Sequence, residues 1–156
     1  QFREQFKVIS ENFSEVFREM FGGGRAQLRL TDAAHVLESP IEIVAQPPGK
    51  NLQNMQLLSG GERALTAIAI LFSILKMKPS PFCILDEIEA ALDDANVSRY
   101  AQYLKKFAEE TQFIVITHRK GTMEHADVLY GVTMQEKGIS KLISVDFSEA
   151  EKSITA

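Results

Sequence analysis

The chain has 156 residues, of which 45% are hydrophobic and 24% are charged, and its formal net charge is −4 at pH 7. A chain of this length and composition forms one globular domain with a substantial core. The negative charge argues against an independent nucleic-acid-binding domain, because such domains usually carry an excess of basic residues. No signal peptide and no apolar run long enough to span a bilayer are recognisable, so we expect no membrane partner.

The first helical segment carries an apolar stripe at alternating spacings of four and three residues, formed by Phe2, Phe6, Ile9, Phe13, Val16 and Met20. This pattern is typical of a helix that pairs with another helix in a coiled coil. The stripe is short, so an amphipathic helix packed on the domain remains the alternative, which Phe17 favours by widening the stripe. Glycines at 22–24 end the helix. Because the chain begins with Gln1 inside this pattern, we expect it to be a piece of a longer polypeptide.

Beyond this helix, the hydrophobic period and the turn residues predict alternating strands and helices. In chain order they are strands over residues 26–31 and 41–45, a helix over 62–76, a strand over 82–85, a helix from Asp93 or Asp94 to about Glu110, a strand over 112–117, and a hairpin over 128–134 and 139–147. The apolar strands over 82–85 and 112–117 are typical of a central parallel sheet that is covered on both faces. We therefore expect an α/β fold with a parallel sheet core, flanking helices and a β-hairpin, followed by a polar tail that frays.

A phosphate-binding loop of the form Gly-x-x-x-x-Gly-Lys-[Ser/Thr] is absent from the sequence. Gly49-Lys50 is the nearest approach to it. Val44 occupies the place of the first glycine, however, and Asn51 that of the hydroxyl residue. The chain therefore lacks the element with which most P-loop ATPases cradle their nucleotide.

Ser59-Gly60-Gly61 lies where the predicted helix over 62–76 begins. The start of a helix presents unpaired N–H groups and a partial positive charge, which suit phosphate oxygens. Glycine lets the backbone approach a ligand closely, and Ser59 adds a hydroxyl donor. The alternative is that Ser59 only caps the helix. Glu62 is compatible with both interpretations, because acidic residues are favourable in a first turn.

Asp86 and Glu87 follow the predicted strand over 82–85. In parallel α/β sheets, ligands bind beyond the carboxyl ends of the strands. An acid at this place in P-loop ATPases holds Mg²⁺, mostly through water, and a neighbouring glutamate can accept a proton from the attacking water. The alternative is that the two acids only cap the next element.

Thr117-His118 ends the next predicted strand, so His118 is expected at the same sheet edge as Glu87. An imidazole there can hydrogen-bond a phosphate or orient water. Taken alone, a histidine at a strand end is more often structural or exposed. Arg119-Lys120 could steer an anion, but a solvated pair is the better interpretation.

In combination, these motifs resemble the ATPase head of an SMC (structural maintenance of chromosomes) protein, most of all the carboxyl-terminal half of a bacterial condensin-type head. The resemblance runs from Phe2 to about Phe147, and its motifs are the signature Leu58-Ser59-Gly60-Gly61-Glu62, the Walker B strand over 82–87, the D-loop Ala91-Leu92-Asp93 and the switch pair Thr117-His118. Transporter-type ABC ATPases usually have glutamine where this chain has Glu62 and proline where it has Ile88. Many SMC proteins have aspartate where it has Glu89.

The resemblance implies that residues 1–21 are the end of a coiled-coil arm and residues 22–156 the carboxyl-terminal lobe of an ABC-type P-loop NTPase head. In this family the phosphate loop lies in the amino-terminal half of the same head. Two heads then bind two ATP molecules between them. The chain would thus supply half of a nucleotide site and be inactive by itself.

The resemblance also assigns roles to individual residues. The signature residues Ser59, Gly60, Gly61 and Glu62 would contact the γ-phosphate of ATP bound by the opposite head. Asp86 would serve Mg²⁺ through water, and Asp93 would couple the two sites. Glu87 and His118 would be catalytic, Glu87 by activating water and His118 by sensing the γ-phosphate.

For the whole protein, the resemblance implies ATP hydrolysis that drives chromosome condensation and segregation, in the cytoplasm at the nucleoid. Its implied partners are the amino-terminal half of the head, a second SMC head, the winged-helix domain of a kleisin subunit, and DNA through the assembled complex. One alternative is a lobe that mainly docks the kleisin and anchors the arm. Another is a DNA-repair ABC ATPase or a transporter subunit, against which the acidic run over residues 86–93 argues.

Overall fold

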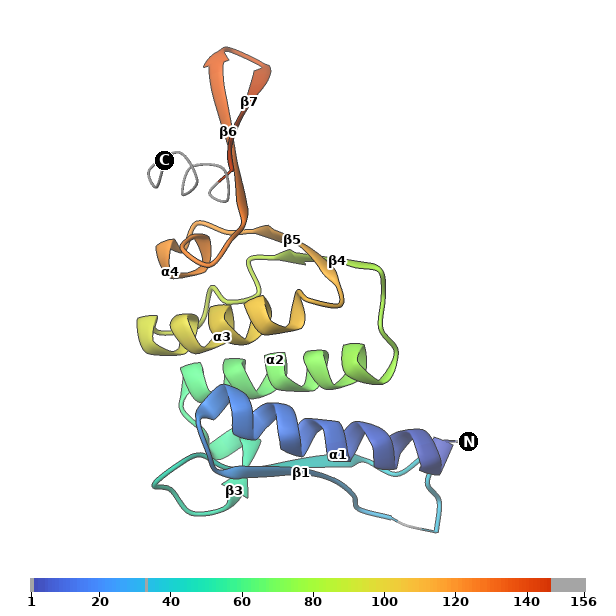
Figure 1. Ribbon diagram of the computed structural model, residues 1–156. Coiled ribbons are helices and arrows are strands. Elements are labelled where there is room, and N and C mark those ends of the chain that lie inside the picture. Colours follow the sequence, from blue (N-terminus) through green and yellow to red (C-terminus); the bar gives the residue numbers. More distant parts are fainter. Residues whose placement is uncertain (1, 33, 147–156) are drawn as a thin grey trace.

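The computed structural model describes residues 2–32 and 34–146 (Figure 1). Its elements in chain order are α1 (Phe2–Phe21), β1 (Arg25–Leu30), β2 (Ile41–Gln46), β3 (Gln53–Asn54), η1 (Met55–Leu57), α2 (Gly60–Met77), β4 (Phe82–Asp86), α3 (Asp94–Phe107), β5 (Gln112–Ile116), α4 (Lys120–Met123), β6 (Val128–Glu136) and β7 (Ile139–Asp146). Figure 1 shows these elements in layers, with the small sheet β1–β3 under α1, then α2 and α3, then the β4–β5 pair. The β6–β7 hairpin projects beyond this last layer.

The predicted first helix is confirmed as α1, and its two halves differ in environment. Side chains of its second half are buried, namely Phe13, Val16, Phe17, Met20 and Phe21. They pack on α2, β1 and α3 because the apolar stripe faces these elements. Phe2, near the other end, remains 40% exposed. The second half of α1 is therefore part of the domain core, as the alternative favoured by Phe17 predicts.

Strands β1, β2 and β3 form an antiparallel sheet in that order. The chain enters it through Gly24, which has φ +79° and lies so close to Gln46 that a Cβ atom would be 2.2 Å from the Gln46 carbonyl oxygen. Only glycine fits this place. The tight turn sets α1 directly on the sheet (Figure 1).

The middle of the core is aromatic. The ring of Phe72 on α2 lies 5.2 Å from that of Tyr103 and 5.4 Å from that of Phe107, both on α3. It lies 6.0 Å from Phe113 on β5. Burial of each of these aromatic side chains contributes about 1.5–3 kcal/mol to the stability of the fold. Phe72 thus joins the helical layer to the parallel strands whose ends carry the candidate site.

β4 and β5 form the predicted parallel pair, in register from Phe82 opposite Gln112 to Asp86 opposite Ile116. The prediction that these strands are covered on both faces is wrong for the described residues. One face packs on the helical layer through Leu85 and its neighbours, whereas the other exposes Phe82, Ile84, Ile114 and Ile116. The physical reason is that α2 and α3 both lie on the same side of the pair (Figure 1).

The remaining predicted elements are present, and most of their bounds agree with the prediction within one or two residues. The helix expected to reach about Glu110 ends at Phe107. The predicted hairpin is confirmed, with Gly138 at φ +85° in its turn, but the prediction for Phe147 and the tail falls outside the described residues. The short elements β3, η1 and α4 escape the sequence prediction because two to four residues carry no hydrophobic period. Within the described ranges, no helix is both long and apolar enough to cross a bilayer.

Candidate functional site

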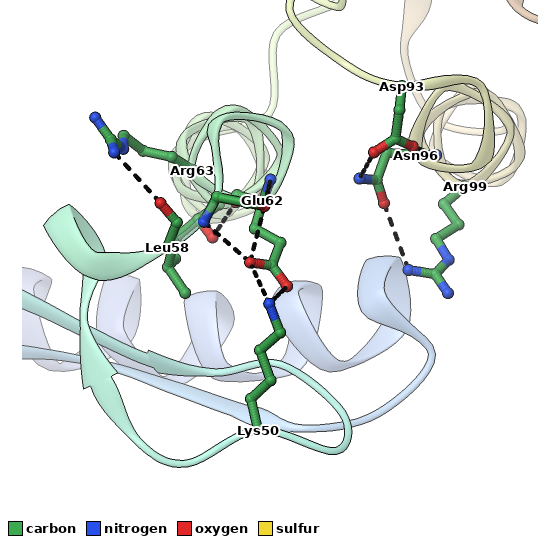
Figure 2. Close-up of polar contacts among 9 residues, drawn as sticks. Lys50, Leu58, Glu62, Arg63, Asp93, Asn96 and Arg99 are labelled. Carbon is green, nitrogen blue, oxygen red and sulfur yellow. Dashed lines mark hydrogen bonds and ion pairs between the residues drawn. The ribbon is translucent and has the colours of Figure 1, made fainter.

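The start of α2 is closed by a reciprocal set of hydrogen bonds between Ser59 and Glu62 (Figure 2). The Ser59 hydroxyl accepts the backbone N–H of Glu62 at 3.3 Å. The Glu62 carboxylate in turn accepts the backbone N–H of Ser59 at 3.1 Å and its hydroxyl at 2.9 Å. Ser59 therefore caps the helix, which was the alternative to phosphate binding. Its hydroxyl points at the carboxylate of Glu62.

Lys50 completes this group from the turn that follows β2. Its Nζ lies 2.9 Å and 3.0 Å from the two carboxylate oxygens of Glu62 (Figure 2). Partial burial of Glu62 raises its pKa, but the hydrogen bonds from Lys50 and Ser59 outweigh that effect. The pKa of the Glu62 carboxyl is consequently held below its ordinary value. In the described structure, the Glu62 carboxylate therefore occupies the N–H and hydroxyl donors of Ser59.

The two glycines of the motif differ in their surroundings. A Cβ atom on Gly60 would meet nothing within 4 Å, so a ligand can approach the backbone there. A Cβ atom on Gly61 would lie 3.1 Å from a carboxylate oxygen of Asp93 and 3.4 Å from the amide nitrogen of Asn96. Gly61 thus allows the start of α2 to lie against the start of α3.

Asp93 caps α3 by accepting the backbone N–H of Asn96 at 2.9 Å and its side-chain amide at 3.0 Å (Figure 2). A pocket of about 290 Å³ lies between this cap and the cap of α2 and is lined by Phe21, Pro47, Pro48, Ser59, Glu62, Asp93, Ala95, Asn96 and Arg99. The predicted signature residues and the predicted coupling residue Asp93 are therefore neighbours in the fold.

The second part of the site lies at the carboxyl ends of β4 and β5. Asp86 is the last residue of β4 and is exposed. Glu87 follows with φ +47°, and its N–H donates to the carbonyl of Ile116 at 2.9 Å. A left-handed conformation is unfavourable for a residue with a side chain and is frequent at functional sites. The backbone is thus held in an unusual shape at the proposed water-activating residue.

His118 lies against Glu87, with its Nδ1 3.2 Å from the Glu87 carboxylate. The two side chains come from the ends of different strands and remain 64% and 53% exposed, respectively. The structure therefore brings together the two residues that the sequence predicts at one sheet edge. A solvent-accessible carboxylate and imidazole in contact can exchange a proton with a water molecule between them and a substrate.

The environments of two residues near this pair, Arg119 and Glu89, differ from what the sequence indicates. Arg119, interpreted as solvated, donates to the Leu92 carbonyl at 3.0 Å and to the Asp94 carboxylate at 2.9 Å. Glu89 is buried under the same loop. The sequence indicates neither the contacts of Arg119 nor the burial of Glu89, because both depend on how the loop after β5 folds back on the loop after β4. Lys120, in contrast, is exposed as expected.

The structure does not join the two parts of the site directly. No hydrogen bond or ion pair within the described ranges connects the Ser59–Glu62 group to the Glu87–His118 pair. This separation is compatible with two parts that act on different nucleotides. The same ranges hold no group of three histidine, cysteine, aspartate or glutamate side chains able to bind a metal ion alone. Asp86 nevertheless fits Mg²⁺, which needs one or two carboxylates when phosphate oxygens and water complete its shell.

The family is decided by comparison with known proteins. A model described as "RecF/RecN/SMC N terminal domain" matches residues 3–141. The chain belongs to this family. It is 68% identical over 152 residues to the chromosome partition protein Smc of Bacillus subtilis (strain 168) and 64% identical over 144 residues to that of Clostridium kluyveri (strain NBRC 12016). These matches cover 97% and 92% of the chain but only 13% and 12% of the relatives' length.

Solved structures of SMC heads share the fold. A chain from a study of ATP-driven dimerization and DNA-stimulated activation of SMC ATPases is 44% identical, with a TM-score of 0.87 over 99% of this chain and 93% of that chain. An Smc head bound to the carboxyl-terminal domain of ScpA, from Pyrococcus furiosus, is 45% identical, with a TM-score of 0.86 over 99% of this chain and 38% of that chain. The expected SMC family and its α/β ATPase-head fold are thereby confirmed.

Proposed function

We propose that this chain is the carboxyl-terminal half of an SMC head and supplies half of an ATP-hydrolysing site. The observation that carries the proposal is the contact of His118 with Glu87 at the ends of two parallel strands. The backbone of Glu87 is left-handed there. The absence of a phosphate loop from these 156 residues supports the other part of the proposal, that a separate amino-terminal half must provide it.

In this proposal Glu87 accepts a proton from the attacking water, and His118 orients Glu87 and contacts the terminal phosphate. Both side chains are exposed enough to reach a substrate that docks on the sheet edge. Mg²⁺, when bound to ATP, would neutralise the phosphate charge, and Asp86 would hold it through coordinated water. Catalysis then comes mainly from positioning and electrostatics.

The Ser59–Glu62 group would serve the ATP bound by a second head. Ser59 would donate its hydroxyl, and the backbone at Gly60 would approach the γ-phosphate closely because nothing obstructs it. Asp93 caps α3, which follows the loop that carries Glu87, and its carboxylate lies against Gly61 at the start of α2, so it would couple the two sites. Contact with the second head would therefore complete both sites together.

The relatives suggest the role of the whole protein. Two of them are named chromosome partition proteins, and one related head was solved in complex with ScpA. We infer that the full polypeptide condenses and segregates chromosomes at the nucleoid in the cytoplasm, with ATP and Mg²⁺ as cofactors. Its partners would be a second head, the winged-helix domain of a kleisin subunit, and DNA through the assembled complex.

The test is ATP turnover by this chain alone and mixed with the amino-terminal half that carries the phosphate loop. We expect no turnover alone, turnover in the mixture, and its loss with Glu87→Gln. Turnover by the isolated chain would contradict the split site. Inactivity of a mixture shown to assemble would contradict the proposed hydrolysis.

A second candidate function is docking of the kleisin and anchoring of the arm, without a catalytic contribution. It is favoured by exposed apolar side chains on the β6–β7 hairpin, namely Tyr130, Val132, Met134, Ile139, Leu142 and Ile143. A related Smc head was also solved bound to the winged-helix domain of ScpA. Two results together would favour this candidate: Glu87→Gln binds a winged-helix kleisin fragment, and the substitution has no effect on ATP turnover.

A further inference from the structure

Glu89 is a buried carboxylate on the loop between β4 and α3. Its side chain is only 1% exposed. One carboxylate oxygen accepts the hydroxyl of Thr117 at 2.5 Å and the hydroxyl of Thr122 at 2.9 Å. The other oxygen is also buried and has no hydrogen-bond partner among the described residues.

This environment is unfavourable for a side chain that serves stability alone. Burial of a carboxylate is costly unless both oxygens are satisfied, and one oxygen of Glu89 is not. The nearby Tyr100 hydroxyl is buried without a partner too, and burial followed by the negative charge of Glu89 raises the pKa of Tyr100. The position therefore calls for a role beyond the packing of the loop.

The partners of Glu89 lie on either side of His118 in the sequence. Thr117 immediately precedes His118, and its hydroxyl also accepts the backbone N–H of Arg119 at 3.0 Å. Thr122 lies in α4, the short helix that follows. The single oxygen of Glu89 thus holds both ends of the segment that presents His118.

Glu89 is equally well placed on its own loop. It lies two residues after Glu87, and its backbone carbonyl accepts the N–H of Leu92 at 2.9 Å. Arg119 reaches back to the carbonyl of Leu92 at 3.0 Å. The loop that carries Glu87 and the segment that carries His118 are therefore fixed to each other through Glu89 and through the hydrogen bond of Arg119 to Leu92.

We propose that Glu89 is a positioning residue that sets His118 against Glu87 by binding Thr117 and Thr122. The inference rests on the proposed function, because it concerns the same pair. His118 and Glu87 meet through one contact of 3.2 Å and are otherwise largely exposed, so their geometry must come from the segments that carry them. A displacement of about 1 Å at such a pair lowers the rate on the order of 100-fold.

The experiment measures kcat and KM for ATP in the full head assembled from both halves. Glu89→Ala removes the acceptor, and kcat is expected to fall on the order of 10- to 100-fold. KM should change much less, because the phosphate loop of the amino-terminal half would supply most of the contacts that bind ATP. Glu89→Gln keeps a carbonyl oxygen that can accept both threonine hydroxyls, so it should restore most of kcat. A glutamine variant as slow as the alanine variant would overturn the proposal.

Thr122→Val and Thr111→Val are a matched pair that keeps the test independent of the folding of Glu89→Ala. Both threonines are buried, but the Thr111 hydroxyl has no partner within the described ranges, whereas that of Thr122 binds Glu89. Thr122→Val should lower kcat about threefold to tenfold, the size expected for one hydrogen bond. Thr111→Val should leave kcat unchanged. Equal kcat values for the two variants would contradict the proposal.

Glu87→Gln, assayed in the same assembly, separates this inference from the function on which it rests. If Glu87→Gln retains turnover, the proposed function fails. If it abolishes turnover while Glu89→Ala and Thr122→Val keep the parental kcat, only the role of Glu89 fails. Loss of kcat in all three, with rescue by Glu89→Gln, supports both.

Discussion

The carboxylate of Glu62 takes the place that a bound anion could occupy at the start of α2. It accepts both the N–H and the hydroxyl of Ser59 and forms an ion pair with Lys50. A phosphate group that reaches this helix start must share or displace these donors. These internal contacts therefore oppose the binding of an external anion at the start of α2.

The pH dependence of stability should report these contacts. Because the pKa of Glu62 is lowered in the folded protein, its contribution to stability is complete above the ordinary value of 4.5. It is lost as the pH falls through the lower pKa of the folded state. We expect Glu62→Gln to reduce the acid dependence in this range, measured by chemical denaturation of the assembled head at pH 3–7. Glu15 and Asp32, whose pKa values are also lowered, retain the remaining dependence. Identical pH profiles would show that the Lys50 contact does not stabilise the fold.

Substitutions at the paired glycines should have opposite effects on stability. Gly60→Ala meets open space and should stabilise the fold by up to about 1 kcal/mol, because alanine loses less backbone entropy in a helix. Gly61→Ala places its Cβ against Asp93 and Asn96, which are hydrogen-bonded to each other and cannot easily move. It should destabilise by about 1–3 kcal/mol. Thermal unfolding compares the two directly, and a stabilised Gly61→Ala would show that the two helix starts are not tightly packed.

A residue of the site can be predicted from the sequence when its position follows from the sheet topology and not from contacts between loops. His118 and Glu87 follow from sequence because parallel strands end at the same edge, and that rule needs no tertiary detail. Glu89 and Arg119 do not follow. The partners of each residue lie on the other of the two loops. The same residues in a loop without such contacts would be exposed to solvent.

At the scale of elements, α1 combines two environments in one helix. Phe17 is fully buried, and its ring stacks on that of Phe21 at 4.0 Å between centroids. Phe2 stacks only on Phe6, at 6.2 Å, near the exposed end. The first part of α1 is therefore less buried than the second part, which stabilises the domain core.

Alanine substitutions along α1 should separate these two environments. Phe17→Ala should lower the free energy of unfolding by about 3–5 kcal/mol, because it leaves a cavity in the core. Phe2→Ala should lower it by less than about 1 kcal/mol in a head without the arm. Urea denaturation of the assembled head measures both. Similar losses for the two variants would mean that the whole of α1 is packed on the domain.

The elements themselves were predictable where the period was long. α1, α2 and α3 are recognised by their apolar stripes and by caps such as Ser59 and Asp93. The coverage of β4 was not predictable. An apolar strand such as Phe82–Asp86 predicts that both of its faces are buried, but it does not indicate which segment covers each face. Among the described residues one of these faces is exposed.

On the side away from α2 and α3, the described residues leave one face of the β4–β5 pair uncovered. Phe82, Ile84, Ile114 and Ile116 lie on it side by side, because β4 and β5 pair in parallel and in register. Parallel strands are normally buried on both faces. This exposed face is therefore where we expect the proposed amino-terminal half to pack.

An acidic substitution on this face should distinguish an incomplete fold from a complete one. Ile84→Asp introduces a charge that costs little on an exposed face but is strongly unfavourable once the face is covered. We expect the variant to be as folded as the parent when expressed alone and less prone to associate, because the apolar patch is smaller. It should fail to assemble with the amino-terminal half and so show no ATP turnover in the mixture. Leu37→Asp is the matched control, since Leu37 is an exposed leucine on the connection between β1 and β2, away from this face. Size-exclusion chromatography of each variant alone and after co-expression measures both effects. Normal assembly of Ile84→Asp would mean that the other half does not cover the face, whereas loss of assembly in Ile84→Asp alone places the junction of the two halves on β4 and β5.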